Sequence, residues 1–489
     1  MTDKHDEHQE TEGTGTFARP VSRREFLKYA GIAGAAIGVS GGLGGLLAAC
    51  GDDGGETSTT AGATTTAGGA TTTAGGATTT AAGETTTTAD AGAEMGREIK
   101  IGWVTMTTGI YAGLSEPDDF LLQMAKDTIG DGMVCADGKK HPIAWVVKDS
   151  QSDSNRAAEV AGQLITSDKP DIVFAGMTPV VNIPVGQQCE ANGVPCITYG
   201  CPMEPWFFGM GGDPAVGFKW AFNVFWSIAD LNAVYIGLFN KVQTNKKVAC
   251  LYANDPDGSS TADEATGFPS ALQPEGYTWL DPGLVTGGTE DFSSVINQFK
   301  AEGCECLSAL LNPPDFANFW KQAKQQGWIP KVTAIGRAIL TRPDMDAVGD
   351  IGQGLCNEVW WENTHPFKSS LTGLACQDIV DAWDAAKGTP FSPALGLTGG
   401  AGFDVITDVV KRTADLDDPA SYVEAIKATD LQTIVGPIKF SGALPNCAIT
   451  PLVGGQWIGK TGAWQRLVVD NSHYPEIPQT GEIKDLTTF

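Results

Sequence analysis

The chain has 489 residues, 42% hydrophobic and 18% charged, a composition typical of globular proteins that are large enough for more than one domain. Its 58 acidic residues outnumber its 32 lysines and arginines, giving a formal net charge of −26. This charge excludes a nucleic-acid backbone or an anionic lipid surface as a good partner for the folded body.

An arginine pair near the N-terminus precedes a long apolar stretch. SRREFLK at 22–28 is followed by a run rich in glycine and alanine from Tyr29 to Ala49, and together they resemble a twin-arginine export signal. The run ends in LAAC, which resembles the lipobox of bacterial lipoproteins. Residues 1–49 are therefore predicted to be a signal peptide, with Cys50 lipidated. A transmembrane helix is the alternative, because the run is long enough to span a bilayer, but its glycines disfavour a permanent anchor helix.

The segment that follows the predicted signal has low complexity. Residues 50–97 consist mainly of Thr, Ala and Gly, with TTTAGGA-like units that recur. Such a segment cannot bury enough apolar area to offset the entropy cost of ordering. We predict a disordered stalk between the membrane and the body.

The cysteine content is high for a cytosolic protein. Of the 11 cysteines, ten remain when Cys50 is set aside, an even number that is compatible with up to five disulfides. Two or more bridges are expected, and buried thiols are the alternative.

From Glu98 onward, short apolar runs alternate with amphipathic stretches. The runs at 99–105, 143–148, 171–176 and 194–198 are typical of buried strands, and helical spacing follows the first three. The alternation restarts after 218–239, with strand-like runs at 247–252, 304–311 and 331–335. A helix is expected after Asp418 and Pro419, which suit the N-cap and the first turn, and TIVGPIKF at 433–440 is the last predicted strand. Two sets of β-α-β units predict two lobes, each with a parallel sheet covered by helices.

These features resemble the type I periplasmic binding proteins, specifically the leucine/isoleucine/valine-binding family and its amide- and urea-binding relatives. The resemblance covers about 98–470, and its most telling stretches are IKIGWVTMTTGIYAG, VVKDSQSDSNRAAEVAGQLI, GVPCITYG, TEDFSSVINQFKAEG and IVGPIKF. It implies an α/β fold of two Rossmann-like lobes joined by a three-strand hinge, with crossings near Asn223, Trp360 and Gly436. Lobe 1 would comprise 98–225 and 362–435, and lobe 2 would comprise 226–361 and 436–489.

In this family, ligand contacts lie at the carboxyl ends of strands and at helix N-termini, where free N–H groups can bind polar groups. The matching positions in the first lobe are Thr107, Thr108, Tyr111, Thr178, Pro179, Tyr199, Gly200 and Cys201. Those of the second lobe are Trp226, Asp257 (in the turn that starts at Asn254), Asn312 and Arg337. Trp206, Phe207, Trp360 and Trp361 are further aromatic candidates, although most of the 13 tryptophans are expected to be core residues.

One position departs from the family pattern. Amino-acid-binding members place a Glu after the strand equivalent to 331–335, where it pairs with the ligand ammonium, whereas this chain has Arg337. An unpaired cation beside a buried cationic ligand would cost several kcal/mol. The hypothesis is that the ligand is not an α-amino acid and that Arg337 holds a carboxylate or another acceptor. The alternative is that Arg337 is a surface residue and the register is shifted.

The sequence offers little support for a metal site, a cofactor or an enzymatic function. The histidines after Cys50 (His141, His365 and His473) lack metal-ligand spacing, so no metal or cofactor is expected. The resemblance implies an extracytoplasmic, lipid-anchored component of an ABC importer, with a small-molecule ligand and a permease as partners. A ligand-sensing receptor of the same fold is the alternative. An enzyme is disfavoured, because no nucleophile, base and orienting residue occur together as a motif.

Overall fold

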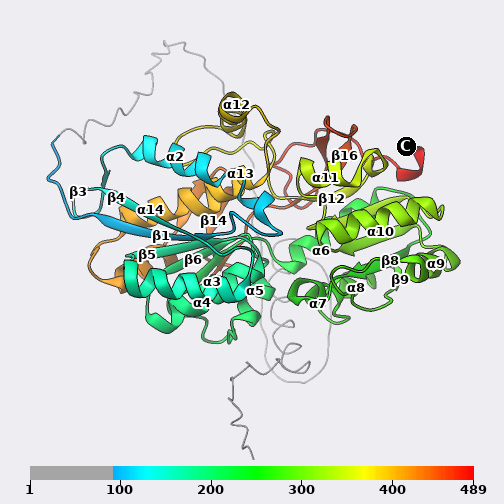
Figure 1. Ribbon diagram of the computed structural model, residues 1–489, viewed down its shortest axis with the longest axis horizontal. Coiled ribbons are helices and arrows are strands. Elements are labelled where there is room, and N and C mark those ends of the chain that lie inside the picture. Colours follow the sequence, from blue (N-terminus) through cyan, green and yellow to red (C-terminus); the bar gives the residue numbers. More distant parts are fainter. Residues whose placement is uncertain (1–91) are drawn as a thin grey trace, which may run out of the picture.

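The computed structural model describes residues 92–489, which form two α/β lobes lying side by side (Figure 1). The first lobe is built on a sheet of six strands in the order β15-β7-β6-β5-β1-β4, in which every neighbouring pair is parallel. Its strands are β1 (Ile99–Thr105), β4 (Ile143–Asp149), β5 (Ile172–Gly176), β6 (Cys196–Tyr199), β7 (Ala221–Val224) and β15 (Cys447–Ala448). The strands β1, β5, β6 and β7 are almost wholly buried, as expected for a parallel sheet covered on both faces.

Helices cover both faces of the first sheet. Figure 1 shows α3, α4 and α5 on one side of this sheet and α2, α13 and α14 on the other. The helices of this lobe are α2 (Asp118–Ile129), α3 (Ser154–Gln163), α4 (Thr178–Asn192), α5 (Met203–Gly209), α12 (Cys376–Lys387), α13 (Ala394–Leu397), α14 (Val405–Arg412) and α15 (Pro419–Lys427). Asp418 caps α15 by accepting a hydrogen bond from the Ala420 N–H, which confirms the prediction made from Asp418 and Pro419.

The second lobe repeats the plan on a smaller scale. Its four-stranded sheet has the order β11-β10-β8-β9, again with only parallel pairs. The strands are β8 (Lys247–Tyr252), β9 (Thr278–Leu280), β10 (Cys306–Leu310) and β11 (Val332–Gly336). The helices are α6 (Ile228–Asn240), α7 (Pro256–Ala262), α8 (Phe268–Leu272), α9 (Ser293–Ala301), α10 (Pro313–Gln325) and α11 (Arg342–Val348). Within residues 92–489, no helix is both long enough and apolar enough to cross a bilayer.

A third, antiparallel sheet completes the second lobe. It comprises β12 (Cys356–Val359), β16 (Val453–Ile458) and β17 (Gln465–Asp470), and the two C-terminal strands lie beyond the last strand predicted from the sequence. The predicted strand at 433–440 is instead part of a hairpin of β13 (Asp430–Thr433) and β14 (Gly436–Lys439), and a smaller hairpin joins β2 (Met133–Val134) to β3 (Lys140–His141).

The chain passes between the two lobes three times. The first passage follows β7, which contains Asn223, and the second follows β12, which ends just before Trp360. The third differs from the expected place near Gly436, because β15 still pairs with β7 in the first sheet. The passage therefore lies after Ala448, and residues 436–448 belong with the first lobe.

The ordered body begins before residue 98, although the predicted stalk extends to residue 97. Met95 forms a bridge with Lys140, and the Glu94 carbonyl accepts a hydrogen bond from the Lys140 N–H at 2.8 Å. Arg97 forms ion pairs with Asp171 at 2.8 Å and with Asp417 at 2.7 Å. The predicted signal peptide, Cys50 and nearly all of the stalk lie outside the described residues.

Disulfides were expected, but in residues 92–489 the structure has free thiols instead. Ten cysteines occur there, and every one is buried and unbridged. Most lie inside strands or helices, for example Cys250 in β8 and Cys306 in β10, with side chains packed in the apolar core. Free cysteine behaves as a small hydrophobic residue, so these ten cysteines are explained by packing in the core rather than by disulfide bonds.

Candidate functional site

A largely apolar cavity lies between the lobes, at the carboxyl ends of both parallel sheets. Thr178 follows β5 and Gly200 follows β6 in the first lobe, while Asp257 follows β8 and Arg337 follows β11 in the second. Most of the wall is apolar, with Leu114, Met177, Phe225, Leu231, Leu310 and Leu340 among its residues. Carboxyl ends of strands are the usual ligand-binding edge of open α/β sheets.

The cavity is narrow in this structure. Its volume is about 60 Å³, well below the roughly 150 Å³ of an engineered cavity that binds benzene. A bound solute therefore requires the lobes to separate or the lining side chains to move. A contact across the cleft holds the present arrangement, because the Tyr111 hydroxyl donates a hydrogen bond to Asn312 Oδ1 at 3.2 Å.

Five polar atoms of the lining are buried without a hydrogen-bond partner. Within the described part of the chain, these are Thr178 Oγ1, Trp226 Nε1, Asp257 Oδ1, Arg337 Nε and Trp360 Nε1. A buried polar group that lacks a partner costs roughly 1–3 kcal/mol, so unpartnered groups are rare in folded proteins and require an explanation. Their concentration around one cavity is the chemical feature that distinguishes this site.

Arg337 is held by acidic groups. Its guanidinium lies 2.8 Å from Asp255 Oδ2 and 3.5 Å from Asp257 Oδ2, and its side chain is only 12% exposed. Burial alone would lower the pKa of Arg337, but Asp257 and Asp255 outweigh it and raise the pKa. Burial also raises the pKa of Asp257 to about 6, against the opposing effect of Arg337. Arg337 is thus neither a surface residue nor an unpaired cation, and the charge argument against a ligand ammonium loses its basis.

Glu358 adds a second buried acid to the wall. It lies in β12. One of its carboxylate oxygens accepts a hydrogen bond from the Tyr235 hydroxyl at 2.9 Å, and the other accepts one from the backbone N–H of Arg337 at 3.3 Å. Burial raises the pKa of Glu358 to about 7. Carboxyl groups therefore outnumber the single guanidinium at this end of the cavity.

Two lining residues have an unusual backbone conformation. Thr178 has φ 71° and Arg337 has φ 63°, in the left-handed region that residues with a side chain rarely adopt, especially β-branched ones. Such residues cluster at ligand sites, where the surrounding structure holds them in place. Gly200 also lies in this region, with φ 73°, and a Cβ there would lie 2.7 Å from Met177 Cγ.

Six of the twelve predicted ligand-binding residues line the cavity. They are Thr178, Pro179, Gly200, Trp226, Asp257 and Arg337. Tyr111 and Asn312 form the contact across the cleft instead. The other four lie elsewhere: Thr107 and Thr108 are exposed, with Thr108 Oγ1 donating to Asp149 at 2.6 Å, and Tyr199 and Cys201 are buried in the core of the first lobe.

Glu358 and most of the apolar wall of the cavity were not predicted from the sequence. Glu358 lies in a strand whose other residues are buried. The single acid within the otherwise uncharged run CNEVWW was the only sequence feature that could have indicated a functional role. Of the aromatic candidates, Trp360 lines the cavity and packs edge-to-face on Phe225. Trp206, Phe207 and Trp361 are core residues.

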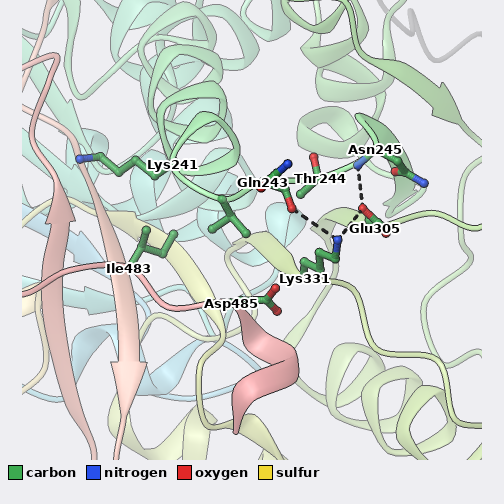
Figure 2. A pocket seen from close by; sticks show the side chains of 9 residues that line it. Lys241, Gln243, Thr244, Asn245, Glu305, Lys331, Ile483 and Asp485 are labelled. Carbon is green, nitrogen blue, oxygen red and sulfur yellow. Dashed lines mark hydrogen bonds and ion pairs between the residues drawn. The ribbon is translucent and has the colours of Figure 1, made fainter.

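A larger hollow of about 620 Å³ opens elsewhere on the second lobe, beside the amino ends of β8, β10 and β11. Figure 2 shows its polar lining, in which Lys331 contacts Glu305 at 3.1 Å and the Gln243 carbonyl at 3.4 Å. Lys241, another lining residue, pairs with Asp470 at 3.4 Å. Because these charges are already paired and the hollow lies away from the carboxyl ends of the strands, the cleft is the better candidate site.

Comparison with known proteins identifies the family. The model of the family described as "Periplasmic binding protein" matches residues 98–461, about three quarters of the chain. The chain belongs to the periplasmic binding protein family. This membership confirms the resemblance and places the protein among extracytoplasmic binding proteins.

Individual relatives of this periplasmic binding protein are distant. Leu/Ile/Val-binding protein homolog 7 of Brucella abortus is 22% identical over 344 residues, covering 68% of this chain and 82% of that protein. The branched-chain amino acid transporter substrate-binding protein LivJ of Streptococcus pneumoniae, solved with isoleucine, has TM-score 0.59 and 18% identity and covers 76% of this chain and 99% of its own. A solute-binding protein of Rhodopseudomonas palustris, solved with 3,4-dihydroxybenzoic acid, has TM-score 0.59 and 17% identity, covering 77% and 99%. All three are named as binding proteins, not enzymes, and the two structures confirm the fold.

Proposed function

We propose that the protein is a lipid-anchored extracytoplasmic solute-binding protein that captures a small organic solute in the interlobe cleft and delivers it to an ABC importer. The solute is of the amino acid, amide or carboxylate type. The observation that carries the proposal is the apolar cavity whose wall, drawn from both lobes, contains five buried polar atoms without partners. A solute that satisfies those atoms stabilises the closed arrangement, which couples capture to lobe closure.

Three further observations support parts of the proposal. The family assignment supports binding rather than catalysis. The names of the similar proteins, which include a transporter component solved with isoleucine, support transport and the ligand class. The lipid anchor at Cys50 is supported by the LAAC sequence that ends the N-terminal apolar run.

A panel of solutes tests the proposal by thermal unfolding. The panel contains leucine, isoleucine, short-chain amides, urea, and aliphatic and aromatic carboxylates. A ligand at about a thousand times its dissociation constant stabilises the folded state by roughly 4 kcal/mol, enough to raise the unfolding temperature by several degrees. At least one class is expected to produce such a shift, and a panel without any shift would contradict the proposed ligand classes.

The Tyr111–Asn312 contact provides a prediction about closure. Tyr111→Phe removes the only hydroxyl in the hydrogen bond that joins the two lobes there. One hydrogen bond contributes about 1 kcal/mol, so the closed, ligand-bound state should weaken by about fivefold in affinity. Titration calorimetry with the panel ligand of highest affinity measures the change. Tyr422→Phe is the control, since the Tyr422 hydroxyl bonds the Leu416 carbonyl within the first lobe and its loss should leave affinity unchanged.

A further inference from the structure

The chemistry of the unpartnered atoms restricts what the solute must offer. An indole Nε1–H and an arginine Nε–H are donors only, so Trp226, Trp360 and Arg337 each require an acceptor. An ionised carboxylate is an acceptor only, so Asp257 Oδ1 requires a donor. The complementary solute therefore carries both an acceptor and a donor on an otherwise apolar body.

The charged groups of the wall leave one carboxylate oxygen available to a donor group of the solute. Arg337 is paired with Asp255 at 2.8 Å, and Asp257 Oδ2 lies 3.5 Å from the same guanidinium, which leaves Asp257 Oδ1 without a partner. Glu358 is less available, because both of its oxygens already accept hydrogen bonds. A solute with an anionic group and no donor would enter a wall with more carboxyl groups than cations and would leave Asp257 unsatisfied.

We infer that Asp257 is the specificity-determining residue of the cleft, accepting a hydrogen bond from a donor group of the solute while the indole N–H groups of Trp226 and Trp360 bind its acceptor. The inference rests on the proposed function and deepens it. The Arg337 guanidinium, 3.5 Å from Asp257 Oδ2, orients Asp257. The donor-binding carboxylate of this protein is thus supplied from α7.

A matched series of probes and variants tests the inference by titration calorimetry. The probes are leucine, 4-methylpentanamide, 4-methylpentanoate and 3,4-dihydroxybenzoate, of which only 4-methylpentanoate lacks a donor at neutral pH. The variants are Asp257→Asn, which keeps the shape and removes the charge, and Trp360→Phe, which removes the indole N–H. Asp344→Asn is the control, because Asp344 is a partly buried acid of the second lobe that belongs to the capping box of α11, outside the cavity.

The expected result has three parts. In wild-type protein, the tightest probe should bind at least ten times more tightly than 4-methylpentanoate. In Asp257→Asn, leucine should lose more affinity than the other probes, and its loss should be at least tenfold. Trp360→Phe should weaken all bound probes by about threefold to tenfold, because each carries an acceptor. Asp344→Asn should stay within twofold of wild type.

Two results would overturn the inference. If Asp257→Asn keeps its affinity within threefold for every bound probe, or if 4-methylpentanoate is the tightest ligand, Asp257 is not the acceptor for the solute's donor group. The proposed function would still stand in either case. If none of the four probes binds wild-type protein, the proposed function fails for these ligand classes and the role of Asp257 fails with it.

Discussion

Arg466→Ala is expected to lower the free energy of unfolding by about 3–5 kcal/mol, the usual loss when one partner of a buried ion pair is removed. Arg466 Nε lies 2.8 Å from Glu362 Oε1, and the two side chains are 0% and 3% exposed. The guanidinium also donates to the Leu340 and Trp361 carbonyls, each at 3.2 Å, and packs over the Trp457 ring. It therefore connects β17 to the segment after β12, where the chain passes between the lobes. Urea unfolding measures the loss.

Two further variants distinguish the loss of a buried charge from a general effect of shortening a side chain. Lys439→Ala removes one partner of an exposed pair with Asp430, whose side chains are 61% and 67% exposed, and should cost less than about 1 kcal/mol. The double variant Arg466→Met/Glu362→Leu removes both charges and should recover most of the stability lost in Arg466→Ala. A loss below about 1 kcal/mol in Arg466→Ala would show that the pair does not hold this passage.

The second large effect concerns Asp118 and depends on pH. Asp118 is 3% exposed, and burial raises its pKa from 3.8 to about 8 despite hydrogen bonds from Thr105 and Ser115. The folded state therefore binds an extra proton between about pH 4 and pH 8, and stability falls as pH rises through that window. Between pH 5.5 and pH 8 this group alone should remove on the order of 3 kcal/mol.

Asp118→Asn should cancel that part of the pH dependence. The free energy of unfolding of the variant minus that of wild type is expected to be larger at pH 8 than at pH 5.5, by on the order of 3 kcal/mol. Comparing variant with wild type removes the opposite contribution of His365, whose pKa burial lowers to about 3. Asp119→Asn, an exposed neighbour, is the control and should show no such difference. An equal effect of Asp118→Asn at both pH values would contradict the buried, protonated carboxyl.

The sequence predicted seven strands of the two parallel sheets, because these strands are short apolar runs separated by helical periodicity, but it did not predict β7 and β9. The run at 247–252 coincides with β8, and the run at 99–105 coincides with β1. The third sheet was missed because β16 and β17, at 453–458 and 465–470, pair locally as an antiparallel hairpin outside the β-α-β alternation. The two-residue strand β15 could not be anticipated either, because only its pairing with β7 defines it.

The part of the cavity lining that follows directly from sheet topology could be predicted from the sequence. Residues directly after a strand, such as Thr178 after β5 and Arg337 after β11, line the cavity because parallel strands align their carboxyl ends. Tyr199 and Cys201 flank Gly200 but project into the core, which the sequence pattern of a turn does not reveal. The pairing of Arg337 with Asp255 and Asp257 joins β11 to the β8–α7 turn. The charge balance at the cavity therefore could not be predicted without the three-dimensional structure.

A crystal structure of the protein with the panel ligand of highest affinity would locate the binding site. We expect the solute between Thr178 of the first lobe and Asp257 of the second, with its acceptor toward the indoles of Trp226 and Trp360. A solute bound in the hollow beside Lys331, or one that contacts a single lobe only, would contradict this expectation.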